Sequence, residues 1–357
     1  MTTNVVAAGT TRDSARPYAR SWLDVFFGAM TALPGPTWVA YAVLTTLSIL
    51  LSNSALWLSG LRPWGELDAQ QVYWGATTAG IAAAAHHLRN LAGASFDRFR
   101  PALGSGIPDP ERVRYELTVM PAVPVAAITL FSFAVTPLYY LTDPVASQVV
   151  GLTPVGLGAR VLSEGAATTV FLAVAFQAVR QLRAVTRLHR DADGVDPFRP
   201  VPLYAFSRLT SQTGIVLVLW ISGGVLANPA ALDVEGFAAL WLPWLVFTPL
   251  VAIVVFVLPL LGMHGRLEAE KDDLEEAADG RMRDLVRELN EAIDARAADR
   301  VERVDRMVSA LRHERELLAR LPTWPWSTGT IRGFGSALLL PLVLFLIQRY
   351  LGAALGG

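Results

Sequence analysis

Apolar runs close to twenty residues long recur along the chain, separated by shorter polar stretches. A helix needs about 20 apolar residues to cross the hydrocarbon core of a bilayer, where it satisfies its own backbone hydrogen bonds. The pattern therefore predicts an all-α, polytopic membrane protein with about seven transmembrane helices. The predicted spans are Thr37–Ser59, Gln71–His87, Leu117–Leu141, Leu162–Arg180, Leu209–Ala227, Phe237–Met263 and Phe334–Tyr350.

The second of these spans is built from small residues rather than large apolar ones. Small side chains at a spacing of four let helix backbones approach closely in a membrane. Ala76, Gly80 and Ala84 have this spacing, so they are the predicted helix-packing residues. We expect this helix at the centre of the bundle.

Residues 263–322, between the last two spans, form a charged stretch with helical periodicity. Residues 263–321 hold 12 of the 30 basic and 16 of the 31 acidic residues of the chain. As one straight helix this stretch would reach roughly 90 Å, although both of its ends adjoin membrane segments. The pattern predicts a coiled-coil-like hairpin, with Gly280 as the hinge and a second bend near Ala297–Ala298 as an addition.

These features divide the chain into four parts. Residues 1–36 are a tail and interfacial segment, 37–262 a six-helix membrane region, and 263–322 the charged hairpin. Residues 323–357 hold a Trp/Pro turn and the seventh span. Trp324 and Trp326 in that turn are predicted interfacial anchors, because tryptophan is enriched where a bilayer meets water.

The placement of arginine predicts the orientation of the chain. Connections on the cytoplasmic side of a membrane protein carry an excess of Lys and Arg. The tail and the segments after spans two and four are rich in arginine, whereas the alternate connections carry Arg62, Arg160 and then no basic residue. We therefore expect the N-terminus and the hairpin inside and the C-terminus outside. Arginine in place of nearly all lysine favours a bacterial chain, and hence the bacterial cytoplasmic membrane.

Composition further narrows the classes of protein and of functional site that fit this chain. The chain of 357 residues is 53% hydrophobic and 17% charged, with a mean hydropathy of +0.40. A formal net charge of −1 gives no reason to expect nucleic-acid binding. The absence of cysteine excludes disulfides, thiolate metal sites and cysteine nucleophiles. The lipid bilayer is the one partner that composition predicts directly.

Polar chemistry near the membrane is sparse. A polar cluster is predicted at the end of span two, formed by His86, His87, Arg89 and Asn90. We expect it to have an interfacial role, and a proton-linked or ligand-binding role is the alternative. We expect the chain after Asn90 to continue as a helix at the lipid headgroups and to end before Pro101. The pattern implies no cofactor and no metal.

Two short segments resemble known sites without matching them. Residues 151–158 resemble the carbonyl-lined filter TVGYG of potassium channels but depart from it at Pro154 and Leu157, so an apolar outer loop is expected. Residues 191–196 superficially resemble a calcium loop but lack the 12-residue spacing and the terminal glutamate.

No nucleotide-binding, metalloprotease or serine-hydrolase motif occurs, so the sequence gives no support for an enzyme. The leading hypothesis is a sensory or scaffold protein whose hairpin pairs with a second copy or with a cytosolic protein. The alternative is an oligomeric ion channel, with the hairpin as an assembly collar and the small-residue span lining the pore. A transporter ranks third, because no carboxylate lies at mid-membrane.

Overall fold

The structure is a computed structural model that describes residues 16–103, 109–142, 153–190, 196–198, 200–227 and 237–355. This part of the chain is all-helical and contains no strand, only an isolated bridge between Arg20 and Pro121. Its helices are α2 (Trp22–Ala32), α3 (Thr37–Leu58), α4 (Ala69–Phe99), η1 (Arg100–Leu103), α5 (Pro110–Thr118), α6 (Ala122–Thr142), α8 (Pro154–Arg190), α9 (Pro200–Leu203), α10 (Ala205–Ala227), α11 (Phe237–Val257), η3 (Leu258–Leu260), α12 (Leu261–Asp294), α13 (Ala298–Ala319) and α14 (Thr328–Leu355).

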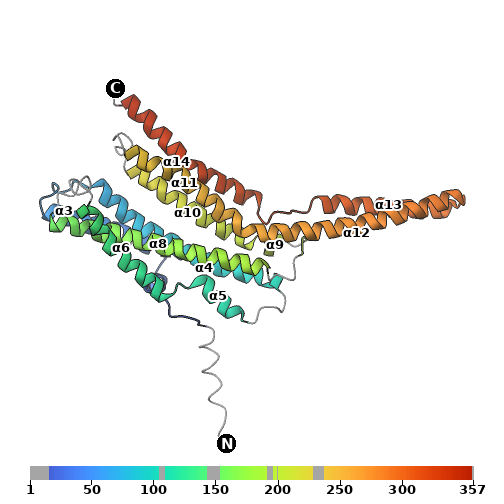
Figure 1. The fold of residues 1–357 in the computed structure, drawn as a ribbon, viewed down its shortest axis with the longest axis horizontal. Helices are drawn as coiled ribbons and strands as arrows, with labels where there is room; N and C mark the ends of the chain where they lie inside the picture. Colours follow the sequence, from blue (N-terminus) through green and yellow to red (C-terminus); the bar gives the residue numbers. More distant parts are fainter. Residues whose placement is uncertain are drawn as a thin grey trace, which may run out of the picture.

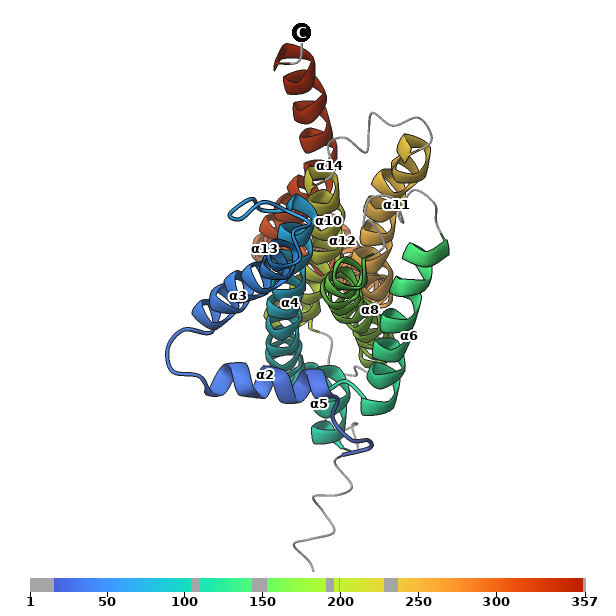
Figure 2. The same cartoon turned by 90° about the vertical axis from the view of Figure 1, so that its left-hand side faces the viewer.

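Helices α4 and α10 form the centre of the bundle (Figures 1 and 2). α4 packs against α3, α8 and α10, and α10 packs in turn against α11 and α14. α6 covers the outer side of α8. The pair formed by α12 and α13 projects away from one end of the bundle, as Figure 1 shows. The small-residue segment therefore lies in the interior, because narrow helices allow neighbours to pack on several sides.

Five described helical stretches are long and apolar enough to cross a membrane. They are Thr37–Leu58, Ala122–Thr142, Pro154–Arg190, Val246–Asp294 and Thr328–Ile347. Large apolar side chains on these helices face outward, for example Leu130 at 74% and Val246 at 61% exposure. Apolar surface of this kind is stable in lipid rather than in water. Seven spans were predicted, and the two that lie in α4 and α10 are not among these five stretches.

The third predicted span is shorter than expected because the chain breaks before it. α5 ends at Thr118 and α6 begins at Ala122. Pro121 lies in the break, where it has no N–H to donate and disfavours helical backbone at the residue before it. The carbonyl of Met120, directly before Pro121, instead accepts a hydrogen bond at 2.9 Å from Ser21 N of the N-terminal segment.

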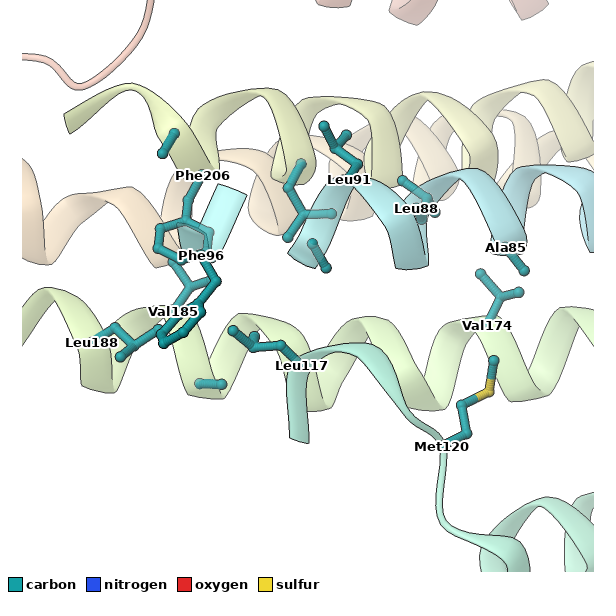
Figure 3. Packing of buried hydrophobic residues seen from close by; sticks show 14 of the residues in the cluster. Ala85, Leu88, Leu91, Phe96, Leu117, Met120, Val174, Val185, Leu188 and Phe206 are labelled. Carbon is teal, nitrogen blue, oxygen red and sulfur yellow. The ribbon is translucent and has the colours of Figure 1, made fainter. Parts of the chain in front are cut away.

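The main apolar core lies where α4 and α8 continue past their predicted spans (Figure 3). Phe96, Phe99 and Phe206 are almost fully buried there, together with Leu117 and Val185. The helix after Asn90 ends at Phe99, before Pro101, as predicted. The phenylalanines that suggested contact with the lipid headgroups are buried in the protein core instead, whereas the position of this helix at the headgroup level stays a prediction.

The close-packing face of α4 differs from the predicted one. Gly80 is exposed, and a Cβ added there would meet nothing within 4 Å. Gly75 is buried instead, and a Cβ there would lie 3.0 Å from Ile49 Cγ1 on α3. The buried small residues Gly75, Ala79 and Ala82 thus lie on the face adjacent to Ala76, Gly80 and Ala84. Every residue from 82 to 85 is alanine, so spacing alone does not reveal which face is buried.

Candidate functional site: the α12–α13 helix pair

Helix α12 begins inside the bundle and ends far outside it. Met263 and Leu267 in its first turns are buried in the main core. Farther along, Leu274, Ala278, Met282 and Leu285 pack against Leu311, Leu318 and Leu321 of the returning chain. These residues recur at steps of three and four, the spacing that places apolar side chains on one face of a helix. The projecting pair therefore has its own small core.

Ion pairs flank this core on its exposed sides. Arg281 contacts Glu314 at 2.6 Å and Arg315 contacts Asp279 at 2.9 Å. Near the tip, Arg300 contacts Glu288 at 3.2 Å. These contacts align α13 antiparallel to α12. Because the partners are about half exposed, each pair contributes only tenths of a kcal/mol and mainly selects the register of the two helices.

The chain turns at residues 295–297, not at the predicted hinge Gly280. α12 runs without interruption through Gly280 to Asp294, and Arg296 adopts a φ of 52°. Ala297 N donates to Ala292 O and Arg296 N to Ile293 O, both at 3.0 Å, which is the Schellman pattern of a helix C-terminus. The turn thus lies beside the second bend that the sequence indicated.

Glycine fails as a hinge here for a local reason. One glycine inside a helix costs about 1 kcal/mol relative to alanine. The residues on both sides of Gly280, Asp279 and Arg281, are each held to α13 by an ion pair, and Ala278 is buried between the helices. A bend at this point would separate all three contacts, so the straight helix is the more stable one.

A groove runs along one side of the pair. It has a volume of about 480 Å³ and is lined by Arg281, Asp284, Leu285, Glu288, Met307, Ala310, Leu311 and Glu314. This lining combines apolar side chains with charged ones of both signs. Met307 is 48% exposed there and is one of several large apolar side chains of the pair that are open to solvent, together with Val286, Ile293 and Leu317. The groove can therefore accept a further apolar helix face.

Stacked aromatic rings join the pair to the bundle. The Trp324 ring lies 3.7 Å from the His264 ring and 4.2 Å from the Trp326 ring, with interplanar angles of 10° and 13°. Trp326 in turn stacks on Phe256 of α11 at 5.3 Å. His264 Nδ1 also lies 2.8 Å from Thr323 O. Both tryptophans hold the base of the helix pair, and their role as anchors at the bilayer surface stays a prediction.

The two adjacent histidines of the predicted polar cluster point to different neighbours. His86 is buried and contacts Tyr41 Oη at 3.1 Å and Thr31 Oγ1 at 3.2 Å. His87 is exposed and contacts Gln212 Oε1 at 2.7 Å. Adjacent helical residues point about 100° apart. The structure therefore separates these histidines instead of joining them into one site.

Arg89 belongs to a different group of side chains. Its Nη1 lies 3.6 Å from Asp24 Oδ1, and Asp24 is buried. Asn90 is exposed on the same helix. The predicted cluster of four is thus divided among three neighbourhoods, and only Arg89 reaches a polar cavity.

A buried ionic cluster lies at the opposite end of α4 and was not singled out from the sequence. Asp68 Oδ1 accepts a hydrogen bond from Arg160 at 3.2 Å, and Asp68 Oδ2 accepts one from Arg62 at 3.0 Å. Asp68 also caps α4 by accepting from Gln71 N. The signal was Asp68 directly before an apolar helix, an ordinary N-cap pattern. Its partner Arg160 is 92 residues away, so spacing could not reveal the pair.

The two segments that resembled known sites contribute no site to the described chain. Pro154 to Gly158 form the first turn of α8, not an outer loop, which removes the extended carbonyl row that a filter requires. Residues 151–152 and 191–195 lie outside the described residues. Among the residues that the structure describes, no group of three or more His, Asp or Glu side chains could hold a metal ion.

Comparison of the chain with protein-family models, with curated proteins and with solved structures finds no match.

Proposed function

We propose that the protein is a multi-pass membrane scaffold that assembles with a second copy of itself through the α12–α13 pair. The seven spans, the bacterial cytoplasmic membrane and the inside position of the pair and the N-terminus belong to this proposal. Five apolar helices and the uneven distribution of arginine support them. The pair then forms a cytoplasmic hairpin that extends from the bilayer.

The observation that carries the proposal is the groove on the pair. Two helices cover only one side of each other, and here the groove leaves Met307 and Ala310 open to solvent. A second pair laid into the groove completes a four-helix arrangement and buries both side chains, which is the usual reason that amphipathic helices associate. The lining carries both Arg281 and acidic residues, so a two-fold related copy can bring opposite charges together across the interface.

The test compares two neighbouring exposed residues of α13. Ala310 lines the groove, whereas Ser309 points away from it. Ala310→Glu places a charge in the groove and is expected to weaken self-association at least about tenfold, whereas Ser309→Glu adds the same charge without effect. Native mass spectrometry of the full chain in detergent measures the dimer fraction over a range of concentrations. A monomeric wild type, or equal loss in both variants, refutes the proposal.

An oligomeric ion channel is the second candidate, and one observation favours it. A groove of about 230 Å³ lies between α4 and α10 and is lined by Tyr73, Thr77, Gly80, Ile81, Ala84, Val216, Leu219, Trp220 and Gly223. Gly80 lies on an open face, as a pore-lining position would. Planar-bilayer recording of purified protein separates the two functions, since ion current abolished by Gly80→Phe supports the channel.

A further inference from the structure

A cavity rich in arginine lies where the N-terminal segment crosses the start of α6. It has a volume of about 260 Å³, and its charged lining residues are Arg16, Arg20, Asp24, Arg89, Glu111 and Arg114. Four of these side chains are cationic and two are anionic. The cavity is separate from the α12–α13 groove and shares no residue with it.

The N-terminal wall of this cavity is held by several hydrogen bonds. Tyr18 Oη donates to Val119 O at 3.0 Å and accepts from Arg180 Nη2 at 2.6 Å. Tyr115 Oη donates to Tyr18 O at 2.8 Å. Burial raises the pKa of the Tyr18 phenol above its ordinary value of 10.0, so the phenol stays protonated and keeps both bonds. The arginines on either side of Tyr18 are therefore held at the cavity by a fixed backbone.

One of the two carboxylates in the cavity is already neutralised. Asp24 Oδ2 accepts from Ser21 Oγ at 2.6 Å and from Met120 N at 2.9 Å. Arg89 Nη1 lies 3.6 Å from Oδ1, which compensates the charge of Asp24, and donates to Asp24 O at 3.5 Å, while its other N–H groups make no hydrogen bond to Asp24. Arg89 thus retains donors for a ligand in the cavity.

The remaining charges leave the cavity positive. Arg114 pairs with Asp97 at 3.2 Å, a contact that is about half exposed. In the described part of the chain no ion pair joins Arg16 or Arg20 to a carboxylate. Of the two carboxylates that line the cavity, Asp24 is compensated by Arg89, so Glu111 is left to oppose these two guanidinium groups. Arginine donates hydrogen bonds in a planar fork that matches the oxygens of phosphate.

The position of the cavity indicates which kind of molecule would bring a phosphate group to these arginines. Val119 in its wall lies three residues before α6, one of the five apolar helices. α2, which starts at the cavity, contacts α3 and α6, runs across the direction of the long bundle helices (Figure 2) and exposes Trp22 and Val25. Trp22 Nε1 donates to Thr129 Oγ1 of α6 at 3.0 Å. An apolar helix that lies flat beside a membrane span, with basic residues at its start, is typical of the headgroup level of a bilayer.

We propose that this cavity binds the phosphate headgroup of an anionic phospholipid. Arg16, Arg20 and Arg89 donate to the phosphate oxygens, while Trp22 and Val25 contact the adjoining acyl chains. The inference rests on the membrane placement proposed above and adds a lipid site to it.

The experiment uses the full chain in nanodiscs with equal amounts of phosphatidylglycerol and phosphatidylcholine of matched acyl chains. Native mass spectrometry then measures which lipid the released protein retains. Arg16→Gln/Arg20→Gln is expected to lower retention of phosphatidylglycerol about tenfold. The matched control is Arg98→Gln/Arg100→Gln, which removes two exposed arginines from the same end of the bundle outside the cavity and is expected to leave retention unchanged.

Each other outcome overturns the inference. Equal retention of both lipids by the wild type, or equal loss in both double variants, shows that the cavity does not select a headgroup. Displacement of phosphatidylglycerol by millimolar inorganic phosphate shows that the cavity takes free phosphate instead. A chain that does not enter nanodiscs at all refutes the membrane placement itself, which distinguishes that failure from a loss of lipid selectivity.

Discussion

Replacing Gly280 by alanine tests whether α12 is one rigid helix or two arms joined at a hinge. The backbone at position 280 is helical, and a Cβ added there would meet nothing within 4 Å. Alanine is favoured over glycine inside a helix by about 1 kcal/mol. Because no steric cost offsets this gain, Gly280→Ala should stabilise the projecting part of α12 by about 1 kcal/mol.

Hydrogen exchange of backbone amides in the full chain measures this gain locally. A stabilisation of about 1 kcal/mol slows exchange through local opening about fivefold, and we expect this for the amides near position 280. The amides of α8 serve as an internal control and should not change. Faster exchange in Gly280→Ala would show that the glycine supplies a bend and would refute the continuous helix. Gly280→Pro should be tolerated by a hinge but should cost about 3 kcal/mol in a helix.

Two further predictions concern the bundle. A Cβ at Gly214 would lie 2.8 Å from Phe334 Cε2 and 3.1 Å from Ala252 O, so Gly214→Ala should lower the free energy of unfolding by about 1–3 kcal/mol. Gly80→Ala should not lower it, because a Cβ there would meet nothing within 4 Å. Denaturation in detergent measures both variants, and equal effects would contradict the packing described. Asp68→Asn removes the carboxylate that pairs with the buried guanidinium of Arg160 and should cost about 3 kcal/mol in the same assay. An unchanged midpoint would contradict the burial of this pair.

The candidate site was predictable in kind but not in detail. The charge content of residues 263–322 and the spacing of their apolar side chains predicted a helical element outside the bundle. The glycine rule placed the turn at Gly280, because a glycine signal is read without the contacts that hold its neighbours. The turn at Arg296 carries no glycine, and its left-handed backbone is held by the hydrogen bonds of Arg296 and Ala297 instead.

The arginine-rich cavity and the buried ionic cluster could not be predicted from the spacing of residues along the chain. Arg16, Arg20 and Asp24 belong to no motif or periodic pattern that predicts a common site. They meet Arg89 because Ser21 and Ala122 hold the N-terminal segment to the start of α6, through backbone bonds between residues about 100 positions apart. No periodicity records such a contact.

The sequence by itself determined the helical class, the apolar segments long enough for a bilayer and the position of the charged insert. These properties follow from the composition of each segment and from its local helical periodicity. Only the tertiary structure decided which face of α4 is buried, where α12 ends and which charges meet in a cavity. A run of alanines offers every face equally, and the choice among them depends on the shape of the neighbouring helices.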